Sequence, residues 1–205
     1  MRVRGRNRGG MGGVTSKAKF GTAIGVGPRG VVAYSSHYGS VGLGQLWDGL
    51  SCYVTAAGRE IYTGFKWQCV EYARRWWVEA HGVTFGNVGM AYEIFDLPHF
   101  ARCSDDAPVT VERCRNGGRG VRPSEGTVLL WHPQGHFAKT GHVAIVTECS
   151  DTWVRVAEQN VSDAPWCDAV RTTGRAACRA SRHRPRHPRP SPTPRAAHAA
   201  VAPSS

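Results

Sequence analysis

The sequence predicts an α+β domain in which one helix packs against an antiparallel sheet. Two observations lead to this fold class. After Cys69, apolar residues recur at steps of three and four, which gives a helix with one apolar face. Later in the chain, short apolar segments alternate with turn residues, as strands do. A helix followed by a run of strands is typical of an α+β domain.

The expected elements are short and well separated along the chain. In order they are a strand over 31–34, a helix from Cys69 to about Ala80, a short helical segment over 90–95, and strands over 127–131, 142–147 and 153–157. The long helix should end at His81-Gly82, because glycine readily adopts the left-handed conformation found at helix ends. We therefore expect the helix that begins at Cys69 to pack on the sheet formed by the later strands.

Composition divides the chain into three regions. Residues 1–19 are rich in Gly and Arg and carry +6, and residues 166–205 are rich in Arg and Pro and carry +7. The net charge is +11, so residues 20–165 carry about −2. We expect a folded domain over 20–165 between a disordered basic leader and a disordered tail, because repeated prolines oppose both helix and sheet.

The basic ends could bind phosphate groups without sequence preference, but the sequence shows no element that reads nucleic acid. A solvated tail is the better interpretation, and we expect no specific nucleic-acid partner. The sequence also contains no apolar segment of about 18 residues, the length that a membrane helix needs. It gives no indication of oligomeric state.

Cysteine usage bears on the compartment. The seven cysteines form no C-x-x-C pair, and the N-terminus lacks the apolar stretch of a secretory signal. A reducing, cytoplasmic setting with free thiols is therefore expected. Because the first residues are Arg-rich and free of acid, an organellar leader stays open as an alternative.

Three residues on separate segments have the chemistry of a thiol hydrolase. Cys69 opens the helix, where the positive end of the backbone dipole favours a thiolate nucleophile. His142 follows a glycine at the start of a strand and could act as base, and Glu158, expected on the next strand, could orient it. The order cysteine, histidine, acid is that of papain-like hydrolases. The Cys69 N–H and the Gln68 amide would bind the oxyanion, with Asn160 nearby.

Each of these residues also has a structural interpretation. Free cysteines are usually small buried hydrophobes, a strand histidine is often only a polar core residue, and Glu158 could be a surface charge. A metal site at His132, His136 and His142 is disfavoured, because their spacing crosses a Pro/Gly loop. We expect no metal and no cofactor.

The motifs together resemble a known family. They are Phe20-Gly21-Thr22 and the segments 30–36, 64–75, 88–95, 141–145 and 154–161. These segments are similar to the glutathionylspermidine amidase domain of the CHAP (peptidase C51) family, a branch of the papain-like hydrolases. That domain forms the N-terminal part of bifunctional glutathionylspermidine synthetase/amidase and of trypanothione synthetase.

The resemblance implies a function in polyamine metabolism. Cys69, His142 and Glu158 would be the catalytic residues, with Arg74 and Asn160 near the glutathione moiety. The reaction would hydrolyse the amide between the glutathione glycine carboxyl and a polyamine amine, so the expected partner is a small glutathione–polyamine conjugate. No ATP-binding synthetase domain follows in this sequence, and we therefore expect hydrolysis alone.

The sequence departs from the family at its C-terminus. The family domain continues with further strands where this chain enters its Arg/Pro-rich tail, so we expect a shortened sheet with an exposed edge. Two rival functions stay open. One is a CHAP-type peptidoglycan hydrolase with the same catalytic residues, and the other is an inactive fragment whose basic tails bind anions.

Overall fold

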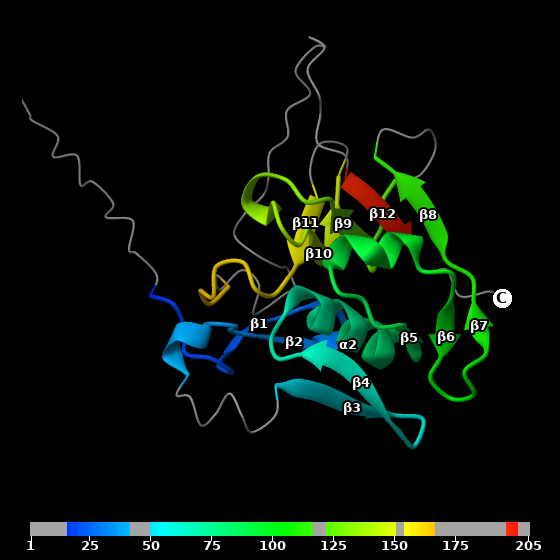
Figure 1. Cartoon of the computed structure of the whole chain (residues 1–205), viewed down its shortest axis with the longest axis horizontal. Helices are drawn as coiled ribbons and strands as arrows, with labels where there is room; N and C mark the ends of the chain where they lie inside the picture. Colours follow the sequence, from blue (N-terminus) through cyan, green and yellow to red (C-terminus); the bar gives the residue numbers. More distant parts are fainter. Residues whose placement is uncertain (1–15, 42–49, 117–121, 151–153, 167–195, 201–205) are drawn as a thin grey trace, which may run out of the picture.

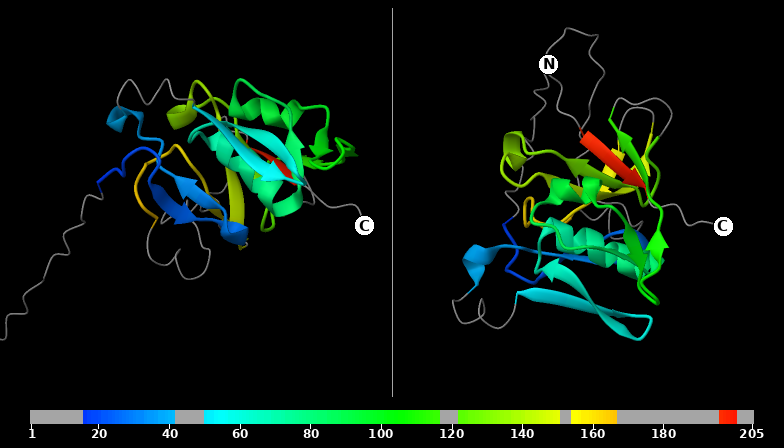
Figure 2. Two further views of the ribbon diagram at one scale, coloured as in Figure 1. Left: turned by 90° about the horizontal axis from the view of Figure 1, so that it is seen from below. Right: turned by 45° about the vertical axis from the view of Figure 1, so that its right-hand side comes forward.

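The computed structural model describes residues 16–41, 50–116, 122–150 and 154–166, together with the backbone of 196–200. Its centre is the helix α2 (Cys69–His81). The helix lies between the hairpin of residues 51–65 and a five-stranded sheet that includes residues 128–131 and 142–149 (Figures 1 and 2). The strands are β1 (Ala23–Val26), β2 (Val32–Tyr34), β3 (Ser51–Ala56), β4 (Arg59–Phe65), β5 (Val83–Phe85), β6 (Phe100–Arg102), β7 (Pro108–Val109), β8 (Glu112–Arg115), β9 (Val128–Trp131), β10 (His142–Cys149), β11 (Val154–Ala157) and β12 (Ala196–Ala200). The short 3₁₀ helices of the described residues are η1 (Pro28–Gly30), η2 (Tyr38–Ser40), η3 (Ala91–Asp96) and η4 (Gly135–Phe137). The mixed α and β content agrees with the predicted fold class.

The helix α2 forms where the apolar period predicted it. Gln68 precedes it in an extended conformation, and Gly82, with φ of 62°, ends it by donating its N–H to the Val78 carbonyl at 2.9 Å. Glycine has no Cβ to clash in this left-handed conformation, which explains why the helix ends at Gly82. The predicted helix is confirmed, with His81 as its last residue.

The apolar face of α2 makes the main core. Trp76 and Trp77 are fully buried, and Trp77 packs edge-on against Phe85 and Phe100 with ring centroids 5.3 and 4.6 Å apart. Edge-to-face pairs of this kind add to the free energy gained from burial of the rings. The helix also packs against β4, β5 and β10, which connects it to the strands on either side (Figure 1).

The larger sheet has the order β11-β10-β9-β12-β8, and every neighbouring pair is antiparallel. His142 pairs with Trp131 across β10 and β9, and Ile145 pairs with Ala157 across β10 and β11. The predicted strands over 31–34, 127–131, 142–147 and 153–157 correspond to β2, β9, β10 and β11, and the helical segment over 90–95 corresponds to η3. The sequence patterns did not reveal the β3–β4 hairpin, β1, the β5-β6-β7 sheet or β8.

The last residues of the expected leader, 17 and 18, make contacts with the segment near residue 163. The Ala18 N–H donates to the Asp163 carbonyl at 2.8 Å, and Lys17 lies 3.8 Å from the Asp163 carboxylate. These contacts tie the end of the expected leader to the folded domain. Residues 1–15 lie outside the described residues.

Two parts of the expected tail over 166–205 make contacts with the rest of the described chain. The Trp166 N–H donates to the Ile24 carbonyl at 2.6 Å, and the Trp166 side chain packs on the core. Residues Ala196–Ala200 form β12, which lies between β9 and β8. The prolines stop at Pro194 and resume at Pro203, so this segment can supply every N–H that a central strand needs. Because β12 pairs with β9, that side of β9 is not an exposed edge; residues 167–195 and 201–205 lie outside the described residues.

Candidate active site

Cys69 is the first residue of α2 and is 9% exposed. A backbone N–H in the first turn of a helix has no acceptor within the helix, so it is available to a ligand. The positive end of the helix dipole also stabilises negative charge on a group placed there. All five cysteines in the described ranges, Cys52, Cys69, Cys103, Cys114 and Cys149, are free thiols.

His142 is placed opposite Cys69 by a tight approach of two strands. It is the first residue of β10 and is 2% exposed. Gly141 before it has φ of 62°, and a Cβ there would lie 2.3 Å from the Trp131 carbonyl oxygen. Only glycine fits this position without displacing the backbone of β9. The glycine that precedes the histidine in the sequence therefore sets the position of the imidazole.

Glu158 contacts the His142 ring. Its Oε2 lies 2.9 Å from His142 Nε2, and its side chain is 19% exposed. Glu158 directly follows β11 rather than lying within it, which corrects the expected position by one residue. Since Ile145 pairs with Ala157, continuing that register brings Glu158 opposite Ala144, on the same face of the sheet as His142.

The protonation of His142 follows from these contacts. Burial alone would lower its pKa, because it disfavours the charged ring. Hydrogen bonds to the Cys69 and Glu158 side chains, together with the negative charge of both partners, outweigh burial and raise the pKa of His142 to about 9. The ring is therefore an imidazolium at neutral pH, held between a carboxylate and the sulfur.

Aromatic rings surround the imidazolium. Phe137 of η4 stacks on the His142 ring, with centroids 4.4 Å apart and planes 8° from parallel. Trp131, the strand partner of His142, approaches at 5.6 Å between centroids. The negative face of a phenyl ring favours a cation stacked on it, so Phe137 supports the charged form of His142 as well as its orientation.

The side chain of Gln68, the residue before Cys69, forms a small hydrogen-bonded cluster. The Gln68 side chain donates to the Tyr38 hydroxyl at 2.9 Å and accepts from the Asn160 amide. Asn160 has φ of 60°, and its Oδ1 accepts from the Ser36 hydroxyl at 2.8 Å. Gln68 and Asn160 thus contact each other.

Comparisons with known proteins identify the family of the domain that carries these residues. Residues 60–160 match the CHAP domain family. These residues form a CHAP domain. The chain is 41% identical over 156 residues to "Bifunctional glutathionylspermidine synthetase/amidase" of Escherichia coli (strain K12), covering 75% of this chain and 24% of that protein. It is 30% identical over 150 residues to "Trypanothione synthetase" of Crithidia fasciculata, covering 73% of this chain and 21% of that protein.

These matches confirm the resemblance found in the sequence. The chain spans about a quarter or less of the length of these two curated relatives. A third relative, "Glutathionylspermidine synthase" of Crithidia fasciculata, is 37% identical over 108 residues. The CHAP domain of this chain includes Cys69, His142 and Glu158.

Arg74 is not brought to the cysteine, although the resemblance placed it near the substrate. Its guanidinium is buried and donates to the backbone carbonyls of Thr63 and Gly86, each at 2.9 Å, and it lies 4.5 Å from the centroid of the Phe85 ring. Burial lowers the pKa of Arg74 to about 10. These contacts link α2 to its neighbours inside the CHAP domain, so we do not include Arg74 in the substrate site.

The other histidines of the site loop make aromatic contacts. His132 stacks on Tyr92 at 6.3 Å between centroids, and His136 lies edge-on to Phe137 at 5.2 Å. Within the ranges that the structure describes, no group of three or more His, Cys, Asp or Glu residues could hold a metal ion. No helix there is long and apolar enough to span a membrane.

Sequence analysis missed several residues around the site. Phe137 stacks on His142, and Tyr38 accepts a hydrogen bond from the Gln68 side chain. Gln159 donates a hydrogen bond to the Gln68 carbonyl. Ser36 and Gln159 lie within the motifs that carry the resemblance, but their residue types suggested no role. The sequence could have suggested a role near the site for Phe137, because it lies five residues before His142 in the loop that joins the two strands.

Proposed function

We propose that this chain is a thiol-dependent amidase that hydrolyses the amide bond between glutathione and a polyamine. The observation that carries the proposal is the position of the buried His142 ring, which hydrogen-bonds the Cys69 side chain and has Nε2 2.9 Å from Glu158 Oε2. A thiolate beside an imidazolium is the reactive form of a cysteine nucleophile. The names of the relatives support the amidase class and the glutathione–polyamine substrate.

The first half of the reaction forms a thioester. The Cys69 sulfur attacks the carbonyl carbon of the glutathione glycine, and the carbonyl oxygen becomes an oxyanion. His142 then donates its proton to the amide nitrogen, the C–N bond breaks, and the polyamine leaves as an amine. Glutathione stays bound to Cys69 through an acyl–sulfur bond.

Water completes the second half. His142, now neutral, accepts a proton from a water molecule that attacks the thioester carbonyl. The acyl–sulfur bond breaks and Cys69 and His142 return to the ion pair. Glutathione leaves as the glycine carboxylic acid, which releases its proton to solvent and becomes the carboxylate. Glu158 holds Nε2 of His142 throughout, so that the other ring nitrogen, Nδ1, exchanges the proton.

The oxyanion would be stabilised at the start of α2. The Cys69 N–H lies in the first turn, and the Gln68 amide is held beside it by Tyr38 and Asn160. Donors fixed before the reaction stabilise developing charge without reorganisation during it. Asn160, which is exposed, is the residue we assign to binding of the glutathione moiety. The arrangement of cysteine helix and antiparallel sheet is the one we expect of a papain-like hydrolase.

The substrate is tested by glutathione release. Purified full chain is incubated with glutathionylspermidine, and free glutathione is measured by mass spectrometry for wild type, Cys69→Ala and Cys103→Ala. Cys103 is a matched control because it is also a buried free thiol but packs with Ile61 and Val78. We expect wild type and Cys103→Ala to release glutathione, and Cys69→Ala to lose about 10⁴-fold or more.

Other outcomes would redirect the proposal. If no variant releases glutathione while circular dichroism shows folded protein, the substrate assignment is wrong. Clearing of a bacterial cell-wall suspension by the same wild type would then favour the peptidoglycan hydrolase. Equal release by wild type and Cys69→Ala would refute the thiol mechanism.

A further inference from the structure

Gln159 lies between two site residues but points away from them, into the core. It follows Glu158 and precedes Asn160, and it is 1% exposed whereas Asn160 is exposed. Its Oε1 accepts from the Tyr34 N–H at 2.7 Å and from Arg75 Nη2 at 3.2 Å. Its Nε2 donates to the Gln68 carbonyl at 3.3 Å and to Glu71 Oε2 at 3.0 Å. Every hydrogen-bonding site of this buried amide is therefore used.

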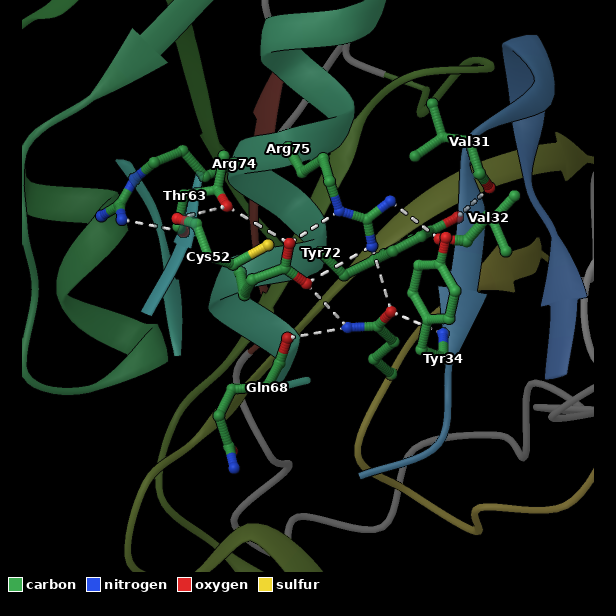
Figure 3. Close-up of polar contacts among 11 residues, drawn as sticks. Val31, Val32, Tyr34, Cys52, Thr63, Gln68, Tyr72, Arg74 and Arg75 are labelled. Atoms are coloured by element: carbon green, nitrogen blue, oxygen red, sulfur yellow. Dashed lines mark hydrogen bonds and ion pairs between the residues drawn. The ribbon is translucent and has the colours of Figure 1, made fainter. Parts of the chain in front are cut away.

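The partners of Gln159 form a charged pair under the cysteine. Glu71 is fully buried, and its Oε1 accepts from Arg75 Nε at 2.6 Å. Arg75 in turn donates from Nη1 to the Val32 carbonyl at 2.8 Å, so the guanidinium lies between α2 and β2 (Figure 3). A buried pair with every polar atom bonded specifies one arrangement of the groups around it, because any shift leaves a charge unpaired.

These bonds join the two halves of the active site. Gln68 is the residue before Cys69, and Glu71 is in the first turn of the helix that Cys69 begins. Glu158 is the residue before Gln159 and holds the base through Nε2. One amide side chain thus connects the backbone next to the nucleophile with the segment that carries the orienting carboxylate. Among the described side-chain contacts, the Asn160–Gln68 bond also joins these two segments, but at the exposed surface.

We propose that Gln159, held by the Glu71–Arg75 pair, is a positioning residue that sets the separation of Cys69 from the His142–Glu158 pair. It would touch neither substrate nor reacting atoms. The proposal rests on the proposed function for its kinetic part, and its effect on Cys69 reactivity does not depend on the identity of the substrate. Small displacements matter in such a site, because a misplacement of about 1 Å can cost about 100-fold in rate.

The alternative is that Gln159 only stabilises the core. A buried amide whose partners are removed destabilises the fold, whatever its relation to the site. The two roles differ in what they predict for folded protein well below its melting temperature. A merely structural residue would leave the cysteine–histidine pair and the rate unchanged there, whereas a positioning residue would alter both.

The test compares Gln159→Ala and Gln159→Asn with Val83→Ala in the full chain. Val83 is a buried residue of β5 that pairs with Arg102 of β6, and its truncation should destabilise the core without changing any residue of the site. Two readouts are taken at a temperature where all variants are folded: kcat and KM for glutathionylspermidine, and the rate at which iodoacetamide alkylates the Cys69 peptide at pH 6. An ordinary thiol, with a pKa near 8.5, is almost fully protonated at pH 6, so fast alkylation there reports the ion pair.

We expect kcat of Gln159→Ala to fall about 100-fold with KM little changed, and alkylation of Cys69 to slow in parallel. Gln159→Asn keeps the amide on a shorter side chain and should recover part of both. Val83→Ala should match wild type in both, even though it melts at a lower temperature. If Gln159→Ala does not fold, the comparison of Gln159→Asn with Val83→Ala decides whether Gln159 is a positioning residue.

Two results would overturn the positioning role. One is wild-type alkylation and kcat in a folded Gln159 variant, and the other is an equal loss in Val83→Ala. If wild type does not turn over glutathionylspermidine, the substrate proposal fails, and the alkylation rates alone decide the role of Gln159.

Discussion

The two ends of the helix α2 differ in the kind of residues that surround them. The N-terminal end carries Cys69 and is surrounded by polar partners, whereas the C-terminal half carries Trp76 and Trp77 and is surrounded by apolar rings. Even the adjacent arginines differ. Arg75 faces a carboxylate and Gln159, on the side of the active site, while Arg74 binds backbone carbonyls beside Phe85. If the proposed function is right, residues for catalysis and residues for stability lie at opposite ends of one helix.

The comparison predicts that changes near the N-terminal end reduce activity more than stability, and that changes at the C-terminal half do the reverse. The largest effect is expected at His142, because in the proposed mechanism it moves the proton in both halves of the reaction. His142→Gln should lower kcat for glutathionylspermidine hydrolysis about 10⁴-fold. His99→Gln, an exposed histidine before β6, is the control and should match wild type. Retention of more than a tenth of the wild-type rate in His142→Gln would exclude it as the base.

The next largest effect belongs to the other end of the helix. Trp77→Ala should lower the free energy of unfolding by about 3–5 kcal/mol, because it removes a fully buried ring and leaves a cavity beside Phe85 and Phe100. Denaturant unfolding followed by circular dichroism measures this loss. At a temperature where the variant is folded, its kcat should stay close to wild type. A drop in kcat comparable with that of His142→Gln would show that the two ends are not independent.

Glu158→Gln should have a smaller effect on activity and a specific effect on titration. The amide keeps the shape but not the negative charge, so the pKa of His142 should fall below its value of about 9. We expect kcat to fall about 100-fold and the alkaline limb of the pH–rate profile to move to lower pH, because the imidazolium loses its proton earlier. NMR titration of the His142 ring checks the shift. An unchanged pKa would mean that Glu158 does not stabilise the charged ring.

The raised pKa of His142 also makes the stability depend on pH. The folded value of about 9 lies above the ordinary histidine value of about 6.5, so the folded state binds the proton more tightly. The contribution of this pKa shift to the free energy of unfolding is fully present below about pH 6.5 and is lost as pH rises through about 9. The midpoint of urea unfolding should therefore fall over this range in wild type and fall less in His142→Gln. The same decline in both proteins would place the titrating group elsewhere.

The smallest effect is expected at Phe137. Phe137→Leu keeps an apolar side chain but removes the ring that stacks on His142, so the pKa of His142 should fall slightly and kcat a few-fold, in line with about 0.5–2 kcal/mol for a cation on an aromatic face. The measurement is the same NMR titration and steady-state assay. An effect as large as that of Glu158→Gln would mean that the ring, rather than the carboxylate, holds the imidazole.

Local patterns in the sequence predicted the parts of the fold that depend on local physics. The three- and four-residue period located α2, and glycine marked both the end of the helix at Gly82 and the approach to His142 at Gly141. The β3–β4 hairpin was missed because its turn uses Ala57 at φ of 50°, where asparagine or glycine is the usual signal. Nothing local indicates that β12 pairs with strands 65 or more residues earlier in the chain.

The candidate site also has parts that the sequence predicted and parts that it did not. Cys69, His142 and Glu158 were predicted from chemistry and order, and the structure brings their side chains together. The inward direction of Gln159 could not be predicted, because it depends on the strand register that also places Glu158. Arg74 and Arg75 are identical in type and adjacent, so only packing reveals that the second one faces the site network.

The most direct test of the account is to trap the acyl-enzyme. Wild-type chain is mixed with glutathionylspermidine, quenched in acid within the first turnover, and digested for peptide mass spectrometry. The account predicts a glutathionyl acyl group on the peptide that carries Cys69, formed in Cys103→Ala as well. Glutathione release with no adduct on Cys69, or with the adduct on another cysteine, would contradict it.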